Sequence, residues 1–214
     1  MPISSQVVFG GTFDPIHRGH LEVIRGLRRE LHLPVLVVPN GTPPHRRRPV
    51  ATGAERLHMV RLALAELADP MVEASDVEVR RSGPSYTADT LAELSAGAPE
   101  RHLLLALGAD AARSLPDWDR PGRITELARL VVFDRLGIEN RGPDVLDQLR
   151  RLGWELAGAR AIQLTAPEVD ASEIRWRLHH GDRCPEWLPE AVGEEIATTG
   201  LYGWHPRAQQ SVMG

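Results

Sequence analysis

Short apolar runs that alternate with longer amphipathic stretches restrict this chain to few folds. The first run, Val7-Val8-Phe9, ends at Gly10-Gly11, and a helix is predicted over residues 21–31. Further strands are predicted over residues 35–38, 71–79, 103–107, 130–133 and 161–164, and further helices over residues 54–67 and 87–94. Strand-length apolar runs separated by helices are typical of a parallel sheet that is covered on both faces.

We therefore predict an α/β fold: a Rossmann-like parallel sheet with helices on both faces and a C-terminal helical segment. The 214 residues fit one domain over residues 1–204, followed by a flexible tail over residues 205–214. Sheets of this kind bind ligands outside the carboxyl ends of their strands. The loops after Phe9, Val38, Leu107 and Phe133 are expected to share one crevice there.

Composition limits the compartment and the partners. The formal net charge of -4 argues against a general nucleic-acid binder. Cys184 is the one cysteine of the chain, which excludes an internal disulfide framework and fits a reducing compartment. No apolar run approaches the roughly 20 residues of a membrane helix, and residues 1–9 are too short for a signal peptide. We expect a soluble cytoplasmic protein with neither nucleic acid nor membrane as a partner.

The loop from Gly10 to His20 is the most informative segment, because it follows a buried strand and opens a helix. Gly10 and Gly11 allow a ligand to approach the backbone closely. The helix start offers free amides and a partial positive charge, which favours an anion, and His17 and His20 can donate to phosphate oxygens. A plain turn before a solvated helix start stays open for either histidine alone. A metal site at the two histidines lacks an evident third ligand, so none is predicted.

The same string resembles the G-x-F-D-P-x-H-x-G-H signature of the nucleotidyltransferase α/β phosphodiesterase superfamily. Within it, the chain resembles bacterial nicotinate mononucleotide adenylyltransferases from Gly10 to about Gly203. Neither a Walker A motif nor G-x-G-x-x-G is present, which disfavours P-loop hydrolysis and ordinary dinucleotide binding. The other matching segments, in the family's order, are Pro43-Pro44-His45-Arg46, Glu55-Arg56 with Met59, Ser85-Tyr86-Thr87, Gly108-Ala109-Asp110 with Leu115 and Trp118, Ala171-Ser172-Glu173-Ile174-Arg175, and Leu201-Tyr202-Gly203.

The resemblance implies overlapping groups of site residues. The catalytic group, which neutralises phosphate charge, is His17, His20 and Arg175. The ATP-binding group is Gly10, Gly11, Thr12, Phe13, His20, Gly108, Asp110, Ser172 and Arg175. The acceptor-binding group is Thr12, His45, Arg46, Tyr86, Thr87 and Trp118. In the last group the amides around Tyr86 and Thr87 would receive a nicotinate carboxylate, and Trp118 would stack on the pyridine ring.

Several of these residues also have a plainer interpretation. Ser172, and either Ser85 or Thr87, read as helix N-caps. Trp118 taken alone would be a core residue, and Arg56 is interpreted as structural.

The implied reaction is attack of the acceptor's phosphate on the α-phosphorus of ATP, with pyrophosphate as the leaving group. A phosphate monoester has a second pKa of about 6, so the attacking phosphate is already ionised at neutral pH and needs no general base. Mg²⁺ is the implied cofactor, bridging the phosphates and held mainly by ATP and water. The family also leaves room for a homo-oligomer.

Two departures from the family pattern keep alternatives open. Val169-Asp170-Ala171 stands where Ile-Ser-Ser or Ile-Ser-Ala is usual, and Leu136 stands where Pro is usual. A carboxylate about 5 Å from a phosphate costs roughly 3 kcal/mol at an effective dielectric near 20, and about 1 kcal/mol in water. Asp170 therefore points away, helps to hold magnesium, or marks a different nucleotide site. The alternatives are nicotinamide mononucleotide or phosphopantetheine as acceptor, cytidylyl transfer, or a catalytically weak nucleotide-binding protein.

Overall fold

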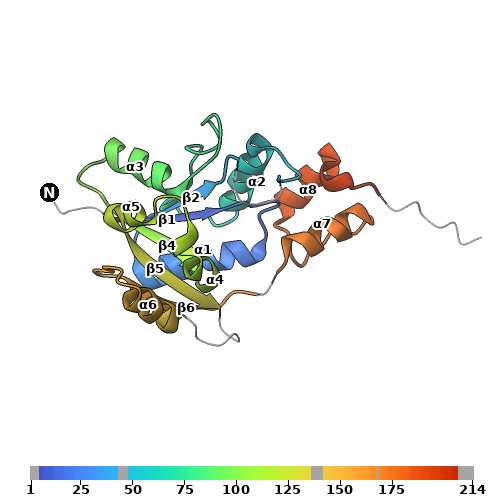
Figure 1. Cartoon of the computed structure of the whole chain (residues 1–214). Helices are drawn as coiled ribbons and strands as arrows, with labels where there is room; N and C mark the ends of the chain where they lie inside the picture. The colour runs from blue at the N-terminus through green and yellow to red at the C-terminus, as the bar shows by residue number, and fades with distance from the viewer. Residues whose placement is uncertain (1–4, 43–47, 136–141, 168, 207–214) are drawn as a thin grey trace, which may run out of the picture.

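Six parallel strands form one sheet in the order β3-β2-β1-β4-β5-β6 (Figure 1). The computed structural model describes residues 5–42, 48–135, 142–167 and 169–206. The strands are β1 (Ser5–Gly11), β2 (Val35–Pro39), β3 (Val72–Ala74), β4 (His102–Gly108), β5 (Ala128–Arg135) and β6 (Arg160–Leu164). All neighbouring strands pair in parallel, which confirms the predicted sheet.

Helices cover both faces of this sheet (Figure 1). They are α1 (Arg18–Leu31), α2 (Gly53–Ala65), α3 (Thr87–Gly97), α4 (Ala109–Arg113), α5 (Pro121–Leu127), α6 (Gly142–Arg151), α7 (Ala171–His179) and α8 (Glu190–Thr199), with 3₁₀ turns η1 (Leu115–Asp117) and η2 (Leu201–Gly203). The strand residues divide between two cores because side chains alternate across a strand. Val7 and Phe9 belong to the core under α1, α2, α7 and α8, whereas Val8 belongs to the core under α3 to α6.

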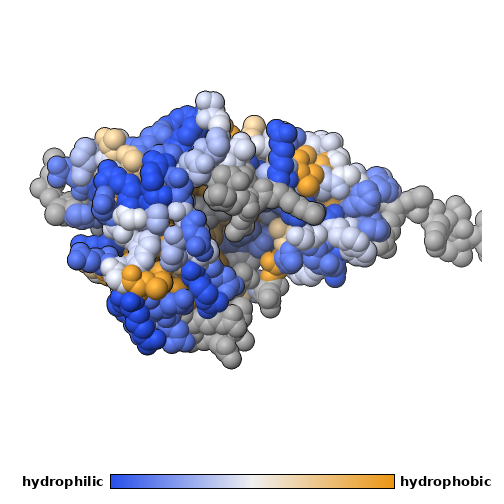
Figure 2. Space-filling view, in the orientation of Figure 1, coloured by the Kyte–Doolittle hydropathy of each residue, from blue (hydrophilic) through white to orange (hydrophobic). Residues whose placement is uncertain are grey.

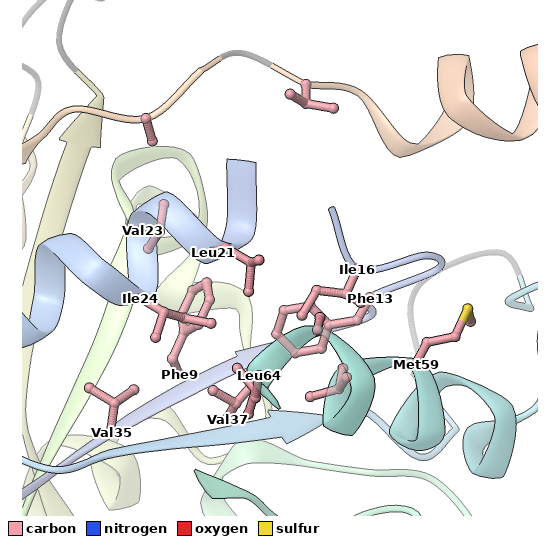
Figure 3. Close-up of a cluster of buried hydrophobic side chains, with 14 of the residues drawn as sticks. Phe9, Phe13, Ile16, Leu21, Val23, Ile24, Val35, Val37, Met59 and Leu64 are labelled. Atoms are coloured by element: carbon pink, nitrogen blue, oxygen red, sulfur yellow. The ribbon is translucent and has the colours of Figure 1, made fainter. Parts of the chain in front are cut away.

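The first core reaches the ligand-binding edge of the sheet. Figure 3 shows Phe9 of β1 and Val37 of β2 in one cluster with Ile24 of α1, and Phe13 and Ile16 of the following loop extend that cluster. Burying side chains of this size contributes about 1.5–3 kcal/mol each. The loop after β1 is therefore anchored by its own apolar residues.

The predicted strand over residues 71–79 is wrong beyond Ala74. The chain turns after β3, with the Arg80 amide donating to the Asp76 carbonyl at 2.9 Å. Val77 and Glu78 are adjacent in this turn and both are buried. A turn allows this, because only an extended strand sends neighbours to opposite faces.

The face of the molecule in Figure 2 is mostly hydrophilic, with apolar side chains in small separate groups. Within the described ranges, none of the helices has the length and apolar character that a membrane span requires.

Candidate active site

A cavity of about 540 Å³ opens at the carboxyl ends of β1, β2 and β4. Its wall combines the ends of these strands with the start of α3 and the segment after α4. The predicted site residues that line it are Gly10, Gly11, Thr12, Tyr86, Thr87, Gly108 and Trp118. The expected shared crevice is thus formed by the loops after β1, β2 and β4. The loop after β5 falls partly in residues 136–141, outside the described ranges.

Gly11 is required by packing as well as by ligand access. A Cβ atom there would lie 2.7 Å from the ring of Phe13. Phe13 is 1% exposed and packs edge-on against Phe9 and His20, with ring centroids 5.8 Å and 4.9 Å away. The Phe13 side chain is therefore part of the core, and a role in ATP binding would fall to its backbone.

His17 and His20 lie together at the start of α1, as the sequence predicts. His17 is the N-cap residue and His20 the third helical residue. Their rings stack with centroids 3.7 Å apart, and the His17 amide donates to Nδ1 of His20 at 3.3 Å. Because Nδ1 of His20 accepts, the proton of its neutral ring is on Nε2, which makes that nitrogen a donor.

Arg175 connects α7 to the loop after β1. Its Nη1 donates to the carbonyl of Asp14 at 2.7 Å, and its Nη2 donates to Oγ of Ser172 at 3.1 Å. Residues 14 and 175 are thereby joined across most of the chain. This bond brings the start of α7 to the loop that holds the histidine pair.

The prediction that Ser172 caps α7 is wrong. Asp170 is the N-cap, and its carboxylate accepts from the Ser172 amide at 2.6 Å. A carboxylate outcompetes a hydroxyl here because it is a stronger acceptor and complements the helix dipole. Asp170 thus occupies an amide that the resemblance assigns to the triphosphate.

The prediction that Ser85 or Thr87 caps α3 is also wrong. Tyr86 is the N-cap and has no side-chain cap bond among the described residues. Ser85 instead bonds to Thr42: its amide donates to the Thr42 carbonyl at 2.9 Å, and its Oγ accepts from the Thr42 amide at 3.3 Å. Tyr86 and Thr87 thus bring to the cavity wall a helix start that lacks a side-chain cap bond from Tyr86.

Trp118 and Asp110 differ in placement. Trp118 is half-buried on the cavity wall, and its Nε1 donates to Oγ of Ser114 at 3.0 Å. The Asp110 side chain is 89% exposed and lies 3.6 Å from Arg113. The structure thus places Trp118 on the cavity wall, while the Asp110 carboxylate points into solvent.

Asp14 and Arg56 hold the loops around the cavity from behind. The buried Asp14 carboxylate accepts from the Val50 and Ala51 amides at 2.8 Å and 3.0 Å, and from the Tyr202 hydroxyl at 2.9 Å. Burial, and then the Asp14 charge, raises the pKa of the Tyr202 hydroxyl. The sequence analysis marked Tyr202 only through the Leu201-Tyr202-Gly203 segment and did not predict this bond.

The structure confirms the interpretation of Arg56 as a structural residue. Its guanidinium donates to the carbonyls of Ala51, Thr12, Asn40 and Gly41 at 2.6 to 3.2 Å. Burial lowers the pKa of Arg56, and the nearby Asp14 charge opposes that effect. One side chain thus holds four carbonyls from two connections, the loop after β1 and the segment between β2 and α2.

Glu78 is a cavity residue that sequence reasoning missed. Its side chain lines the cavity and is 5% exposed. Burial raises its pKa, whereas hydrogen bonds from Thr90, Gly41 and Asn40 act in the opposite direction. The predicted strand over residues 71–79 gave no reason to place Glu78 at the cavity, because the donors that surround it come from other segments.

Three predicted positions lie outside the described residues: His45, Arg46 and Leu136. In the part of the chain that is described, no group of three or more His, Cys, Asp or Glu side chains is arranged to hold a metal ion.

Comparisons with known proteins agree with this geometry. A family model described as cytidylyltransferase-like matches residues 8–181. The chain is 38% identical over 202 residues to a probable nicotinate-nucleotide adenylyltransferase of Dehalococcoides mccartyi, covering 91% of this chain and 95% of that protein. It is 42% identical over 199 residues to the protein of the same name from Thermomicrobium roseum, covering 91% and 90%.

A solved structure shares the fold. Plasmodium falciparum nicotinic acid mononucleotide adenylyltransferase complexed with NaAD superposes with a TM-score of 0.76 at 16% identity, covering 94% of this chain and 98% of that one.

Proposed function

The chain belongs to the cytidylyltransferase-like family and, within it, to the nicotinate-nucleotide adenylyltransferases, and on this premise we propose that it joins ATP and nicotinate mononucleotide to give deamido-NAD and pyrophosphate. The observation that carries the proposal is the cavity itself. It is bordered by the glycine loop and by the uncapped start of α3. Two anion-binding elements beside one cavity suit an acceptor that carries a phosphate and a carboxylate.

The reaction forms one bond and breaks one. An oxygen of the acceptor's phosphate bonds to the α-phosphorus of ATP, and the bond from that phosphorus to the bridging oxygen breaks, so pyrophosphate leaves with the electron pair. The nucleophile is ionised near neutral pH, so no proton need be removed. The protein's contribution is positioning and neutralisation of charge.

Charge neutralisation falls to the first turn of α1 and to Arg175. His17 and His20 are stacked at this helix start, which adds donors to the partial positive charge of the helix. Arg175 bonds to the carbonyl of Asp14, which lies three residues before His17. We assign ATP to Gly10, Gly11, Thr12 and Gly108, with Ser172 and Arg175 at the triphosphate.

The acceptor is assigned to the other end of the cavity. The amides of the first turn of α3, at Tyr86 and Thr87, receive the nicotinate carboxylate, and Trp118 supplies a flat face for the pyridine ring. A neutral carboxamide gains less from the helix start than a carboxylate does. This supports nicotinate mononucleotide over nicotinamide mononucleotide.

Magnesium enters as part of the nucleotide substrate. Mg²⁺ keeps several waters and is bound largely through substrate phosphates in such sites. Among the described residues no group of three or more candidate metal ligands is found, and Asp170 lies at the start of α7. We therefore propose MgATP as the substrate and place the enzyme in the cytoplasm, where ATP is abundant; a homo-oligomer stays part of the proposal.

Pyrophosphate release tests the proposed function. MgATP is supplied with nicotinate mononucleotide, nicotinamide mononucleotide or phosphopantetheine in separate reactions, CTP replaces ATP in a parallel set, and products are identified by mass. Turnover is expected with ATP and nicotinate mononucleotide. ATP binding without turnover of any acceptor would instead support a nucleotide-binding protein.

His20→Ala tests the role of the helix start in that reaction. Removing a donor that faces developing phosphate charge is expected to lower kcat about a hundredfold. The matched control is His58→Ala, because His58 is an exposed histidine on α2 beside Glu195. Equal kcat for His20→Ala and the wild type would remove His20 from the catalytic group.

A further inference from the structure

A buried carboxylate lies in the cavity wall at a place that the proposed reaction leaves without a role. Glu78 accepts from Oγ1 of Thr90 on Oε1 at 2.8 Å and from Nδ2 of Asn40 on Oε2 at 3.4 Å. The amide of Gly41 also donates to it. Thr90 belongs to α3, whereas Asn40 and Gly41 follow β2. One side chain thus joins two walls of the cavity.

The two walls are in close contact around this carboxylate. A Cβ atom on Gly41 would lie 2.3 Å from the backbone oxygen of Glu78, so only glycine fits there. Next to it, Thr42 and Ser85 exchange two hydrogen bonds. The amide of Asn40 donates to the Gly11 carbonyl at 2.9 Å, which continues the connection to the glycine loop.

We infer that Glu78 is a positioning residue of the acceptor pocket: its carboxylate ties the loop after β2 to α3 and thereby fixes the first turn of α3 against the acceptor. Thr90 lies one helical turn after Tyr86 and Thr87, the residues assigned to the acceptor carboxylate. A shift of Thr90 therefore moves that turn directly. The inference rests on the proposed function and deepens it.

The chemistry of the site favours a functional role over a stabilising one. The three donors to Glu78 are neutral, and a buried charge with neutral partners costs stability compared with a neutral residue of the same shape. The cations nearby are Arg81, which donates to Oγ1 of Thr90 at 3.2 Å and pairs with Glu93, and Arg56. Charges retained at such a cost are common at functional sites.

The sign of the pH effect follows from burial. Burial raises the pKa of Glu78 above its ordinary value. Between the ordinary pKa of a glutamate and the raised pKa of folded Glu78, the folded chain binds more protons than the unfolded chain. Stability therefore falls as the pH rises through this window and Glu78 ionises. The ionised form nevertheless is the one that accepts from all three donors.

Glu78→Gln separates positioning from stability. The amide keeps the shape but turns an NH₂ toward one of the donors, so the acceptor KM is expected to rise about tenfold, the loss expected for a bond to a charged acceptor. The KM for ATP is expected to stay within about twofold, and Tm at pH 8 is expected not to fall. The matched control is Glu73→Gln, which removes an exposed glutamate on β3. An unchanged acceptor KM, or a fall in Tm with both KM values raised, overturns the inference.

Thr90 provides a second variant. Thr90→Val, which removes the hydroxyl, is expected to raise the acceptor KM as Glu78→Gln does. Thr90→Ser, which keeps a hydroxyl, is expected to have the acceptor KM of the wild type. The acceptor KM of the double variant Glu78→Gln/Thr90→Val is expected to be no higher than that of either single variant. The acceptor KM of the wild type is expected to rise on acidification more steeply than that of Glu78→Gln. The ratio of the two acceptor KM values at each pH cancels the effect of titrating the acceptor's own phosphate, because both enzymes share it.

Turnover by the wild type tests the proposed function. The ratio of the acceptor KM of the variant to that of the wild type tests the inference about Glu78. If the wild type binds nicotinate mononucleotide without turnover, the same ratios are taken from Kd values measured by calorimetry. Equal Kd values for wild type and Glu78→Gln then count against the inference.

Discussion

At the scale of single residues, Asp170 changes the charge at the start of α7 while still supplying the cap that the helix needs. Its side chain accepts from the Ser172 amide and so supplies the cap that α7 needs. The same carboxylate adds negative charge at the end of α7 that Arg175 joins to the loop after β1. With the triphosphate placed here as proposed, the stability of α7 and the affinity for the triphosphate are in opposition at Asp170.

Asp170→Asn tests that opposition. Asn keeps a capping oxygen and removes the charge, so the KM for ATP is expected to fall about fivefold at low salt, and the gain is expected to shrink at high salt because Asp170 is exposed. Steady-state kinetics at two ionic strengths measure both effects. Glu190→Gln, in the first turn of α8, is the control. A rise in the KM for MgATP would instead make Asp170 a contributor to magnesium binding.

At the scale of elements, the start of α3 is the part of the site that we propose binds the acceptor through its backbone rather than through side chains. Tyr86 has an extended conformation with φ -105° and ψ 135°, and the helix begins at Thr87. Thr87 therefore occupies the first helical position, where its N–H is not needed by the helix. Proline is accepted at this position, and an extended residue before it is what proline prefers.

Thr87→Pro removes one amide donor while leaving α3 in place. The KM for nicotinate mononucleotide is expected to rise about tenfold, and the preference over nicotinamide mononucleotide is expected to narrow, because the lost donor serves the carboxylate. Thr87→Ala keeps the amide and serves as the control. Competition kinetics with both acceptors give the preference, and far-ultraviolet circular dichroism checks the helix. Equal effects of proline and alanine would assign the binding to the Thr87 side chain.

At the scale of the whole molecule, the loop after β1 is bonded to the 3₁₀ turn η2 near the other end of the sequence. The Tyr202 hydroxyl donates to the Asp14 carboxylate at 2.9 Å across 188 residues of sequence. α7 and α8 share a core with α1 and α2, so the C-terminal helices complete the face on which the loop after β1 packs (Figure 1). Folding of the C-terminal segment and ordering of the glycine loop are expected to be coupled.

Tyr202→Phe removes only this hydroxyl. Asp14 then loses one of three donors while buried, and the free energy of unfolding is expected to fall by about 1–2 kcal/mol. For a chain of this size each kcal/mol lowers Tm by about 2–4 °C, which thermal and urea unfolding resolve. Thr198→Val, which removes a hydroxyl bonded only within α8, is the comparison and is expected to change stability by less than about 0.5 kcal/mol. Equal effects of the two variants would show that the Asp14 bond adds nothing.

The sequence by itself determined the sheet, the glycine loop and the family. Apolar runs of strand length, and helices between them, report the faces of each element, and these patterns are local. The motif from Gly10 to His20 combines a turn, a helix start and two histidines within one short segment, so its chemistry could be predicted without knowing the path of the rest of the chain.

Only the tertiary structure decided which groups meet. Asp170 rather than Ser172 caps α7, because the helix begins at Ala171, two residues earlier than a Ser172 cap requires, and capping propensity alone does not fix that start. Glu78 is buried because its donors come from α3 and from the loop after β2, which sequence periodicity does not bring together. The same holds for Tyr202 and Asp14. Hydrogen bonds between distant segments depend on how the elements pack, and the residue pattern of one element does not identify the segment that it will contact.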